Sequence, residues 1–441
     1  MGNMRKSLHF IVVVSMMVLT GIHVSAQNFP SKWLFGGAYM SGQENDTWTE
    51  KAAIKATVTG EGVLKAVDAE GRALQDCELV KGRPAFRAEA GDCFLFEVPS
   101  EGIKPGNFID FDATMAVDPG APMDWIVEWL DGGRWIGGRT FRSHGPALGS
   151  NHRYTSIYQT FRLDAPSADG MVKVRLRALE GACVPATEGK EPTGYAMLVT
   201  STYIGAYIQD FGTVQPKDTT KVLCLGNSFT YYHYCPVMLK EIAWNEGHYL
   251  DISASLKGGR TMKHHHTLEM TQDHIAEGGY DVVFLQDQSQ AAAKVGQDRK
   301  EHAVLVEDMA YMAEKVRTTS PDCKIIVERT WSYPGKEHGG FGSLKAFDAY
   351  SEKGARIMAK AVGNATISPI AEAFIYCREE HPDIMLYHTD GHHQSVYGSY
   401  LKSCVNYLRL FGEPFGENPA DCGIEPKKAA VLRSIAEKIV L

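Results

Sequence analysis

A serine within the sequence Leu225-Gly226-Asn227-Ser228-Phe229-Thr230 has the surroundings of a nucleophile. It directly follows Val222 to Leu225, a short apolar run that predicts a buried strand. A serine at the carboxyl end of such a strand, with a glycine before it to allow a tight turn, keeps its own N–H available to bind an anion. The alternative is that Ser228 only caps the helix that follows.

The sequence Asp390-Gly391-His392-His393 offers that serine a base. A carboxylate three residues before a histidine can accept the proton of the ring, which fixes the tautomer and stabilises the imidazolium formed when a serine is deprotonated. His392 competes for this role, but only His393 has the three-residue spacing from Asp390. The alternative is an Asx turn that opens the next helix. If Ser228, His393 and Asp390 converge, they are suited to nucleophilic attack on an acyl group.

Donors for a tetrahedral oxyanion follow two other predicted strands. Gly258-Gly259 comes after the strand near 251–255 and offers an unobstructed backbone N–H. The sequence Gln286-Asp287-Gln288-Ser289 comes after the strand 281–285 and offers a side-chain amide. Two or three such donors, each worth roughly 3 kcal/mol, stabilise an oxyanion.

The elements that must position these residues change character near residue 217. From about 28 to 212, short stretches alternate apolar and polar residues between turns, as in 124–130, 158–163 and 172–177, and this predicts an all-β, jelly-roll-like sandwich. A linker is predicted at 212–218. Beyond it, buried strands alternate with helices near 236–246, 300–318, 343–361 and 395–411, which predicts a three-layer α/β/α domain with a parallel sheet. The predicted domains are 28–215 and 218–441, and the active residues should meet at the carboxyl ends of the strands of the second domain.

In their order and spacing these motifs resemble the SGNH/GDSL serine hydrolases, and the stretches 225–230, 284–289 and 390–401 resemble the DUF4886 group of exported bacterial proteins. The resemblance covers about residues 220–415. It implies a catalytic triad of Ser228, His393 and Asp390, and an oxyanion hole formed by Ser228, Gly259 and Gln288. Two departures stand out: Asn227 replaces the family's aspartate, and Gln288 replaces an asparagine with a shorter side chain.

Several other residues carry less specific signals. Tyr231, Arg329, Trp331 and Tyr333 lie beside the nucleophile or after a predicted strand, so they are candidates for substrate binding at the pocket rim, with a core role as the alternative. Three consecutive histidines at 264–266 cannot all face one ion, so no metal site is predicted there. The proposed chemistry needs neither a metal nor another cofactor.

The N-terminus and the overall charge indicate where the protein acts. Residues 1–26 combine Arg5 and Lys6, an apolar run from Ile11 to Leu19 and small residues before Gln27, which predicts a secretory signal peptide and a periplasmic or extracellular protein. The apolar run is too short to span a membrane. A formal net charge of −8, spread along the chain, argues against nucleic acid or anionic lipid as the partner. Of the nine cysteines, Cys77 and Cys93 are close enough in sequence to be considered as a disulfide pair.

The expected function is that of a secreted serine esterase that removes acetyl or other small acyl groups from a polysaccharide. One alternative is a methyl esterase acting on a uronic-acid polysaccharide, and another is a non-catalytic glycan-binding protein on the same scaffold. The aromatic residues of the sandwich are compatible with carbohydrate binding or with a packed core. We expect a chain that starts near Asp218 to keep the catalytic fold and its activity on a small aryl ester.

Overall fold

The computed structural model describes residues 31–34, 53–55, 62–80, 83–100, 103–145, 155–186, 188–207 and 219–441. The predicted signal peptide and the predicted linker lie outside these residues, so both stay predictions, as does the domain boundary at the linker. The strands that precede residue 208 are β1 (Ser31–Leu34), β2 (Ala53–Lys55), β3 (Val63–Val67), β4 (Cys77–Val80), β5 (Arg83–Arg87), β6 (Cys93–Pro99), β7 (Asn107–Val117), β8 (Asp124–Asp131), β9 (Arg134–Arg142), β10 (Thr155–Leu163), β11 (Met171–Ala178) and β12 (Tyr195–Tyr207).

These strands form two antiparallel sheets that enclose one core. One sheet has the order β10-β7-β12-β5-β4, with β1 also paired to β12, and the other has the order β2-β3-β6-β11-β8-β9. Side chains along β11 alternate strictly between half-buried and buried, as a strand with one face on a core requires. The buried cluster takes Phe96 from one sheet and Phe111 from the other, with the two rings in edge contact. The prediction of an all-β sandwich is therefore confirmed.

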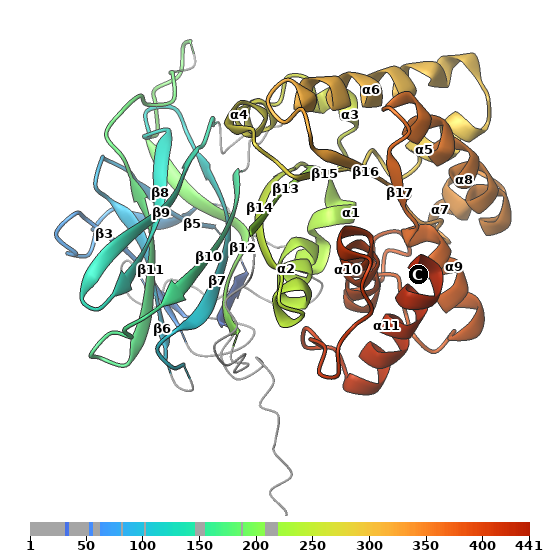
Figure 1. The fold of residues 1–441 in the computed structure, drawn as a ribbon. Coiled ribbons are helices and arrows are strands. Elements are labelled where there is room, and N and C mark those ends of the chain that lie inside the picture. Colours follow the sequence, from blue (N-terminus) through green and yellow to red (C-terminus); the bar gives the residue numbers. More distant parts are fainter. Residues whose placement is uncertain are drawn as a thin grey trace, which may run out of the picture.

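The second half of the chain forms a parallel sheet of order β14-β13-β15-β16-β17 (Figure 1). Its strands are β13 (Thr219–Gly226), β14 (Tyr249–Leu256), β15 (Val282–Leu285), β16 (Lys324–Glu328) and β17 (Thr366–Ser368). Its helical elements are α1 (Ser228–Tyr231), η2 (Tyr232–Tyr234), α2 (Cys235–Asn245), α3 (Met262–His265), α4 (Glu269–Glu277), α5 (Ala291–Gly296), η3 (Lys300–His302), α6 (Ala303–Arg317), α7 (Gly335–Gly339), α8 (Leu344–Ala361), α9 (Ile370–Glu380), α10 (Val396–Phe411) and α11 (Pro426–Val440). None of the helices in the described part of the chain is long and apolar enough to cross a membrane.

Helices cover both faces of the parallel sheet, because successive strand residues point to opposite sides. In β13, Val222 and Cys224 belong to a core that also contains residues of α2, α9, α10 and α11. Leu223 and Leu225 belong to a second core with residues of α3, α4, α5, α6 and α8. The predicted three-layer α/β/α arrangement is confirmed, with the parallel sheet between the two helical layers (Figure 1).

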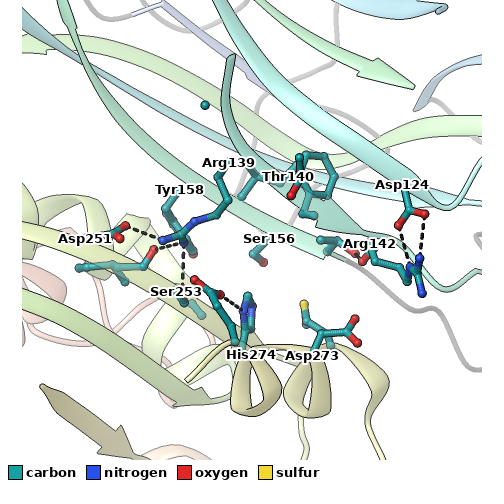
Figure 2. Close-up of a pocket in the computed structure, with 18 of the residues that line it drawn as sticks. Asp124, Arg139, Thr140, Arg142, Ser156, Tyr158, Asp251, Ser253, Asp273 and His274 are labelled. Carbon is teal, nitrogen blue, oxygen red and sulfur yellow. Dashed lines mark hydrogen bonds and ion pairs between the residues drawn. The ribbon is translucent and has the colours of Figure 1, made fainter. Parts of the chain in front are cut away.

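The sandwich packs against β14, the edge strand of the parallel sheet (Figure 1). Arg139 of β9 donates to Asp251 Oδ1 at 2.5 Å and to Ser253 Oγ at 2.9 Å, so its guanidinium covers the exposed edge of β14. Figure 2 shows these bonds at one end of a pocket that lies between the two halves of the molecule. Lys240 of α2 and Asp110 of β7 form a buried ion pair across the same boundary. Strand β14 and helix α2 of the α/β half therefore pack against the sandwich.

Candidate active site

Ser228 is the first residue of α1 and follows β13 after a one-residue turn. Asn227 is the N-cap of α1, with extended backbone angles and a side chain that accepts a hydrogen bond from Phe229 N–H at 3.1 Å. The cap turns the chain sharply between strand and helix and projects Ser228 from the carboxyl end of the sheet. The Ser228 side chain retains a small exposed area, since the residue is 7% exposed.

His393 and Asp390 reach Ser228 from a single turn that precedes α10. Asp390 Oδ1 accepts hydrogen bonds from the N–H groups of His392 and His393 at 2.9 and 3.0 Å. Asp390 Oδ2 lies 2.6 Å from His393 Nδ1, and His393 Nε2 lies 2.8 Å from Ser228 Oγ. A carboxylate can only accept, so the Nδ1 atom carries the proton and Nε2 presents its lone pair to the serine hydroxyl. The structure thus brings together the three residues that the sequence singled out as a triad.

The charge and orientation of this pair are fixed by its surroundings. Burial alone would raise the pKa of Asp390, but the hydrogen bonds from the His393 ring and from two backbone N–H groups outweigh it and lower the pKa to about 2. Asp390 is therefore ionised at neutral pH. The imidazole of His393 stacks on the ring of Tyr232, with centroids 4.1 Å apart and planes 6° apart. This stacking leaves the histidine ring little freedom to turn away from Ser228.

Two backbone N–H groups near the serine are available as oxyanion donors. Neither Ser228 N–H nor Gly259 N–H makes a hydrogen bond within the described residues. Gly259 has a φ of +68° and occupies the third position of a turn closed by a bond from Arg260 N–H to Lys257 O. A positive φ at that position favours glycine, which accounts for the residue type at 259. Their role as donors stays a prediction.

Gln288 is half-buried, and its side chain folds back onto its own loop. Its Oε1 accepts from Gln290 N–H at 2.9 Å, and its Nε2 donates to Ser289 Oγ at 3.0 Å. An amide nitrogen carries two hydrogens, so one of them remains for another acceptor. The assignment of Gln288 to the oxyanion hole stays a prediction.

Three of the four residues predicted at the pocket rim are buried instead. Arg329 is 2% exposed, Trp331 1% and Tyr333 4%, so none of them presents a surface to a substrate. Arg329 pairs with Glu372 at 2.6 Å, and Trp331 stacks between Phe229 and another core aromatic. The prediction of a rim role for these three is wrong, because the segment after β16 packs in the interior, where Trp331 contacts Phe229 and His392, and the alternative of a core role holds.

Tyr231, the fourth predicted rim residue, is only partly buried. A Cβ added to Gly258 would lie 2.8 Å from the Tyr231 hydroxyl oxygen, so this hydroxyl sits directly against the Gly258-Gly259 turn. The absence of a side chain at Gly258 allows this approach. Tyr231 thus borders the candidate oxyanion site, and substrate binding by Tyr231 stays a prediction.

A buried charged network supports the loop that carries Ser228. Lys402 Nζ donates to Phe229 O at 2.8 Å, to Thr230 Oγ1 at 2.9 Å and to Glu328 Oε2 at 2.6 Å, which uses all three of its hydrogens. Glu328 Oε1 accepts from Asn406 Nδ2 at 2.7 Å. No spacing pattern in the sequence predicts this network. Its one sequence signal is Lys402, a lysine on the apolar face of the predicted helix 395–411.

The three consecutive histidines point to different partners, as expected. His265 is buried, with Nε2 3.1 Å from Gly226 O and Nδ1 2.8 Å from Thr271 Oγ1. Burial lowers the pKa of His265 to about 4, so it is a neutral residue that holds the end of β13. His264 bonds within its own turn at Thr261, and His266 lies beside Asp308.

Among the described residues, the one group with metal-ligand chemistry is Asp390, His392 and His393, whose ligand atoms lie within 4.8 Å of one another. Both ring nitrogens of His393 already hydrogen-bond to Asp390 and Ser228. A cation bound to His393 would displace one of these bonds and block proton transfer from the serine.

The nine cysteines are all free thiols, so Cys77 and Cys93 are not paired.

No protein-family model matches the sequence, and no curated protein does either. Among solved structures, a DUF4886 family protein from Bacteroides uniformis is 18% identical, with a TM-score of 0.43 over 51% of this chain and 95% of that one. A GDSL-like protein from Parabacteroides merdae is 14% identical, with a TM-score of 0.36 over 46% of this chain and 99% of that one. A catalytic mutant of an acetylxylan esterase from Geobacillus stearothermophilus is 16% identical, with a TM-score of 0.34 over 44% of this chain and 94% of that one.

The solved structures similar to this one thus include a DUF4886 family protein, a GDSL-like protein and an acetylxylan esterase. Identities and TM-scores of this size do not allow the activity of one protein to be inferred from that of another. The chemistry has to be inferred from the site itself.

Proposed function

We propose that this chain is a serine ester hydrolase that forms an acyl-enzyme on Ser228. The observation that carries the proposal is the continuous set of bonds from Asp390 Oδ2 to His393 Nδ1 at 2.6 Å and from His393 Nε2 to Ser228 Oγ at 2.8 Å. An ionised carboxylate, an oriented imidazole and a serine hydroxyl in this order are the parts that acyl transfer requires.

The reaction has two halves. Ser228 Oγ attacks the ester carbonyl carbon while its proton moves to His393 Nε2, and Asp390 stabilises the imidazolium. The oxyanion takes hydrogen bonds from the N–H groups of Ser228 and Gly259 and from the Gln288 amide. The intermediate collapses, and the leaving alcohol takes the proton from His393. Water then gives a proton to His393 and attacks the acyl carbon. When this second intermediate collapses, the bond to Ser228 Oγ breaks, Ser228 Oγ takes the proton back from His393, and the acid is released.

An acetyl ester on a polysaccharide is the substrate that we propose. The side chains of Asp390 and His393 are 39% and 16% exposed, so the Asp–His end of the triad reaches the surface, where a polymer can approach. A long-chain lipid substrate would need an apolar lid, and the large exposed hydrophobic residues of the described chain are spread over several elements, with only Val304 and Tyr311 sharing one helix, α6. They are Ile136, Val304, Tyr311, Tyr350, Met385 and Leu441. The signal-peptide pattern of residues 1–26 supports export, which would bring the enzyme to extracellular polymers.

The test is to measure acetate and methanol released from a panel of esterified polysaccharides. The panel should include acetylated xylan, because an acetylxylan esterase is among the similar structures, and methyl-esterified polygalacturonate for the alternative substrate. We expect the full chain to release acetate and Ser228→Ala to release none. Release of methanol alone would indicate that the substrate is a methyl ester and not an acetyl ester. Release of neither product from polymers or from 4-nitrophenyl acetate would reject the hydrolase assignment.

A further inference from the structure

Asn227 connects the nucleophile loop to two other loops through both ends of its side-chain amide. Its Oδ1 accepts from Phe229 N–H at 3.1 Å and from Gln286 Nε2 at 3.0 Å. Its Nδ2 donates to Arg260 O at 2.9 Å and to Asp287 O at 3.3 Å. Asn227 is 2% exposed, so these bonds are shielded from water. One side chain therefore touches the loops that carry Ser228, Gly259 and Gln288.

Asp287 joins two of the same loops from the other side. Its Oδ1 accepts from Gln288 N–H at 2.7 Å and from Met262 N–H at 2.9 Å. Met262 begins α3, two residues after the turn that contains Gly259. Asp287 is 5% exposed, and its Oδ2 has no hydrogen-bond partner in the described part of the chain. A buried carboxylate oxygen that accepts hydrogen bonds from the N–H groups of two loops fixes the distance between those loops.

The identity of residue 227 follows from its partners. Arg260 O and Asp287 O are both acceptors, so the atom that faces them must be a donor. An asparagine supplies that donor. An aspartate, which the resembled family has at this position, would place a second acceptor against the two carbonyl oxygens and a buried charge close to Asp287.

We propose that Asn227 and Asp287 are positioning residues of the oxyanion site. Together they hold the Gly259 turn and the Gln288 loop against the Ser228 loop, so that donors from three separate strand ends face one oxygen. The inference deepens the proposed function, on which it rests, because it assigns the residues that assemble the donors.

Kinetic measurements on 4-nitrophenyl acetate test this role. Asn227→Asp removes the donors to Arg260 and Asp287, and Asp287→Ala removes the acceptor of two loop N–H groups. Because a displaced donor is felt mainly when charge develops, we expect each change to lower kcat about 100-fold with little change in KM. Asp287→Asn keeps an oxygen acceptor, so it should recover at least tenfold of the kcat that Asp287→Ala loses.

Hydrogen exchange at the amides of residues 257–263 gives a readout that does not depend on activity. We expect faster exchange in Asn227→Asp and Asp287→Ala than in the full-length wild type, and slower exchange in Asp287→Asn than in Asp287→Ala. Asn245→Asp is the matched control, because Asn245 donates to Asn418 O at the far end of α2 and does not contact the site. It should leave both exchange at 257–263 and kcat unchanged.

The outcomes separate this inference from the proposed function. If the wild type hydrolyses no ester but the exchange changes appear, the proposed function fails while the joining of the loops by Asn227 and Asp287 stands. If the wild type is active and Asn227→Asp and Asp287→Ala keep full kcat and wild-type exchange, the positioning role is rejected. It is also rejected if Asn245→Asp has the same effects, or if Asp287→Asn is as impaired as Asp287→Ala.

Discussion

Lys402 Nζ lies 2.6 Å from Glu328 Oε2, and this ion pair is buried directly below the loop that carries Ser228. Glu328 ends β16, and Lys402 lies on α10, the helix that follows the Asp390–His393 turn. The pair thus connects the strand ends of the sheet to the helix that carries the histidine turn. Its side chains are 1% and 2% exposed, so neither charge is solvated by water.

Lys402→Met should destabilise the protein strongly, because it leaves the Glu328 carboxylate buried without its cation. We expect a loss of about 3–5 kcal/mol in the free energy of unfolding, measured by urea denaturation. Lys353→Met is the control, since Lys353 pairs with Asp298 at the surface and its loss should cost less than about 1 kcal/mol. The double change Lys402→Met with Glu328→Gln should recover part of the loss. A cost below about 1 kcal/mol for Lys402→Met would contradict this reading.

The sandwich should be required for the α/β half to fold. Lys240 is 4% exposed and its carboxylate partner Asp110 belongs to the sandwich, while Tyr158 of β10 lies in the core of the α/β half. The sequence pattern favoured an independent catalytic unit that starts near Asp218, and the structure argues against it. We expect residues 219–441 alone to show no cooperative thermal unfolding by circular dichroism. A melting temperature within about 5 °C of the full chain would restore the original expectation.

The meeting of Ser228, His393 and Asp390 was predictable because the signals of these residues are local. A strand followed by Gly-x-Ser, and an aspartate three residues before a histidine, each define a geometry within one turn, so Ser228, Asp390 and His393 could be named without knowing their separation in space. The strands and helices of the α/β half were predictable for a similar reason, because burial on both faces leaves uninterrupted apolar runs such as Val282–Leu285.

The residues that the sequence misplaced depend on distant packing. Trp331 follows a strand end, where many ligand-binding residues lie, but it is enclosed by Phe229 and Phe374 with centroids 4.4 and 4.5 Å away. The Lys402–Glu328 pair joins positions far apart in the chain, and no spacing rule connects them. Whether a polar residue after a strand lines a pocket or supports one is decided by these tertiary contacts.

Replacing Gln286 by alanine should affect stability, whereas replacing Gln288 by alanine should affect kcat. Gln286 is buried and its Oε1 accepts from Asn227 N–H at 3.1 Å and from Thr230 Oγ1 at 3.0 Å, so Gln286→Ala should lower the melting temperature. If Gln288 is an oxyanion donor, Gln288→Ala should lower kcat on 4-nitrophenyl acetate about 100-fold and leave KM and the melting temperature nearly unchanged. Full turnover by Gln288→Ala would assign the donor elsewhere.

Asp287 should make stability depend on pH in a way that Asp287→Asn does not. Burial raises the pKa of Asp287 from an ordinary 3.8 to about 6, while hydrogen bonds from Gln288 and Met262 partly oppose it. The unfolded chain therefore releases this proton at a lower pH than the folded chain does. Its contribution to stability is present below about pH 4, falls as the pH rises to about 6 and then stays constant, a change of about 3 kcal/mol.

The measurement is the difference in the free energy of unfolding between wild type and Asp287→Asn from pH 4 to pH 7. It should shift by a few kcal/mol in favour of the variant as the pH rises, because the variant has no carboxyl to ionise. A difference that stays constant over this range would show that Asp287 titrates near its ordinary pKa.

The most direct test of the account is the kcat of Ser228→Ala on 4-nitrophenyl acetate at pH 7, beside Ser343→Ala, which removes a serine that caps α8 away from the site. If Ser228 is the nucleophile activated by His393, its replacement should lower kcat by about four to six orders of magnitude while the circular dichroism spectrum is unchanged. Ser343→Ala should stay within about twofold of the wild type. A Ser228→Ala variant that keeps more than about a tenth of the wild-type kcat would contradict the account.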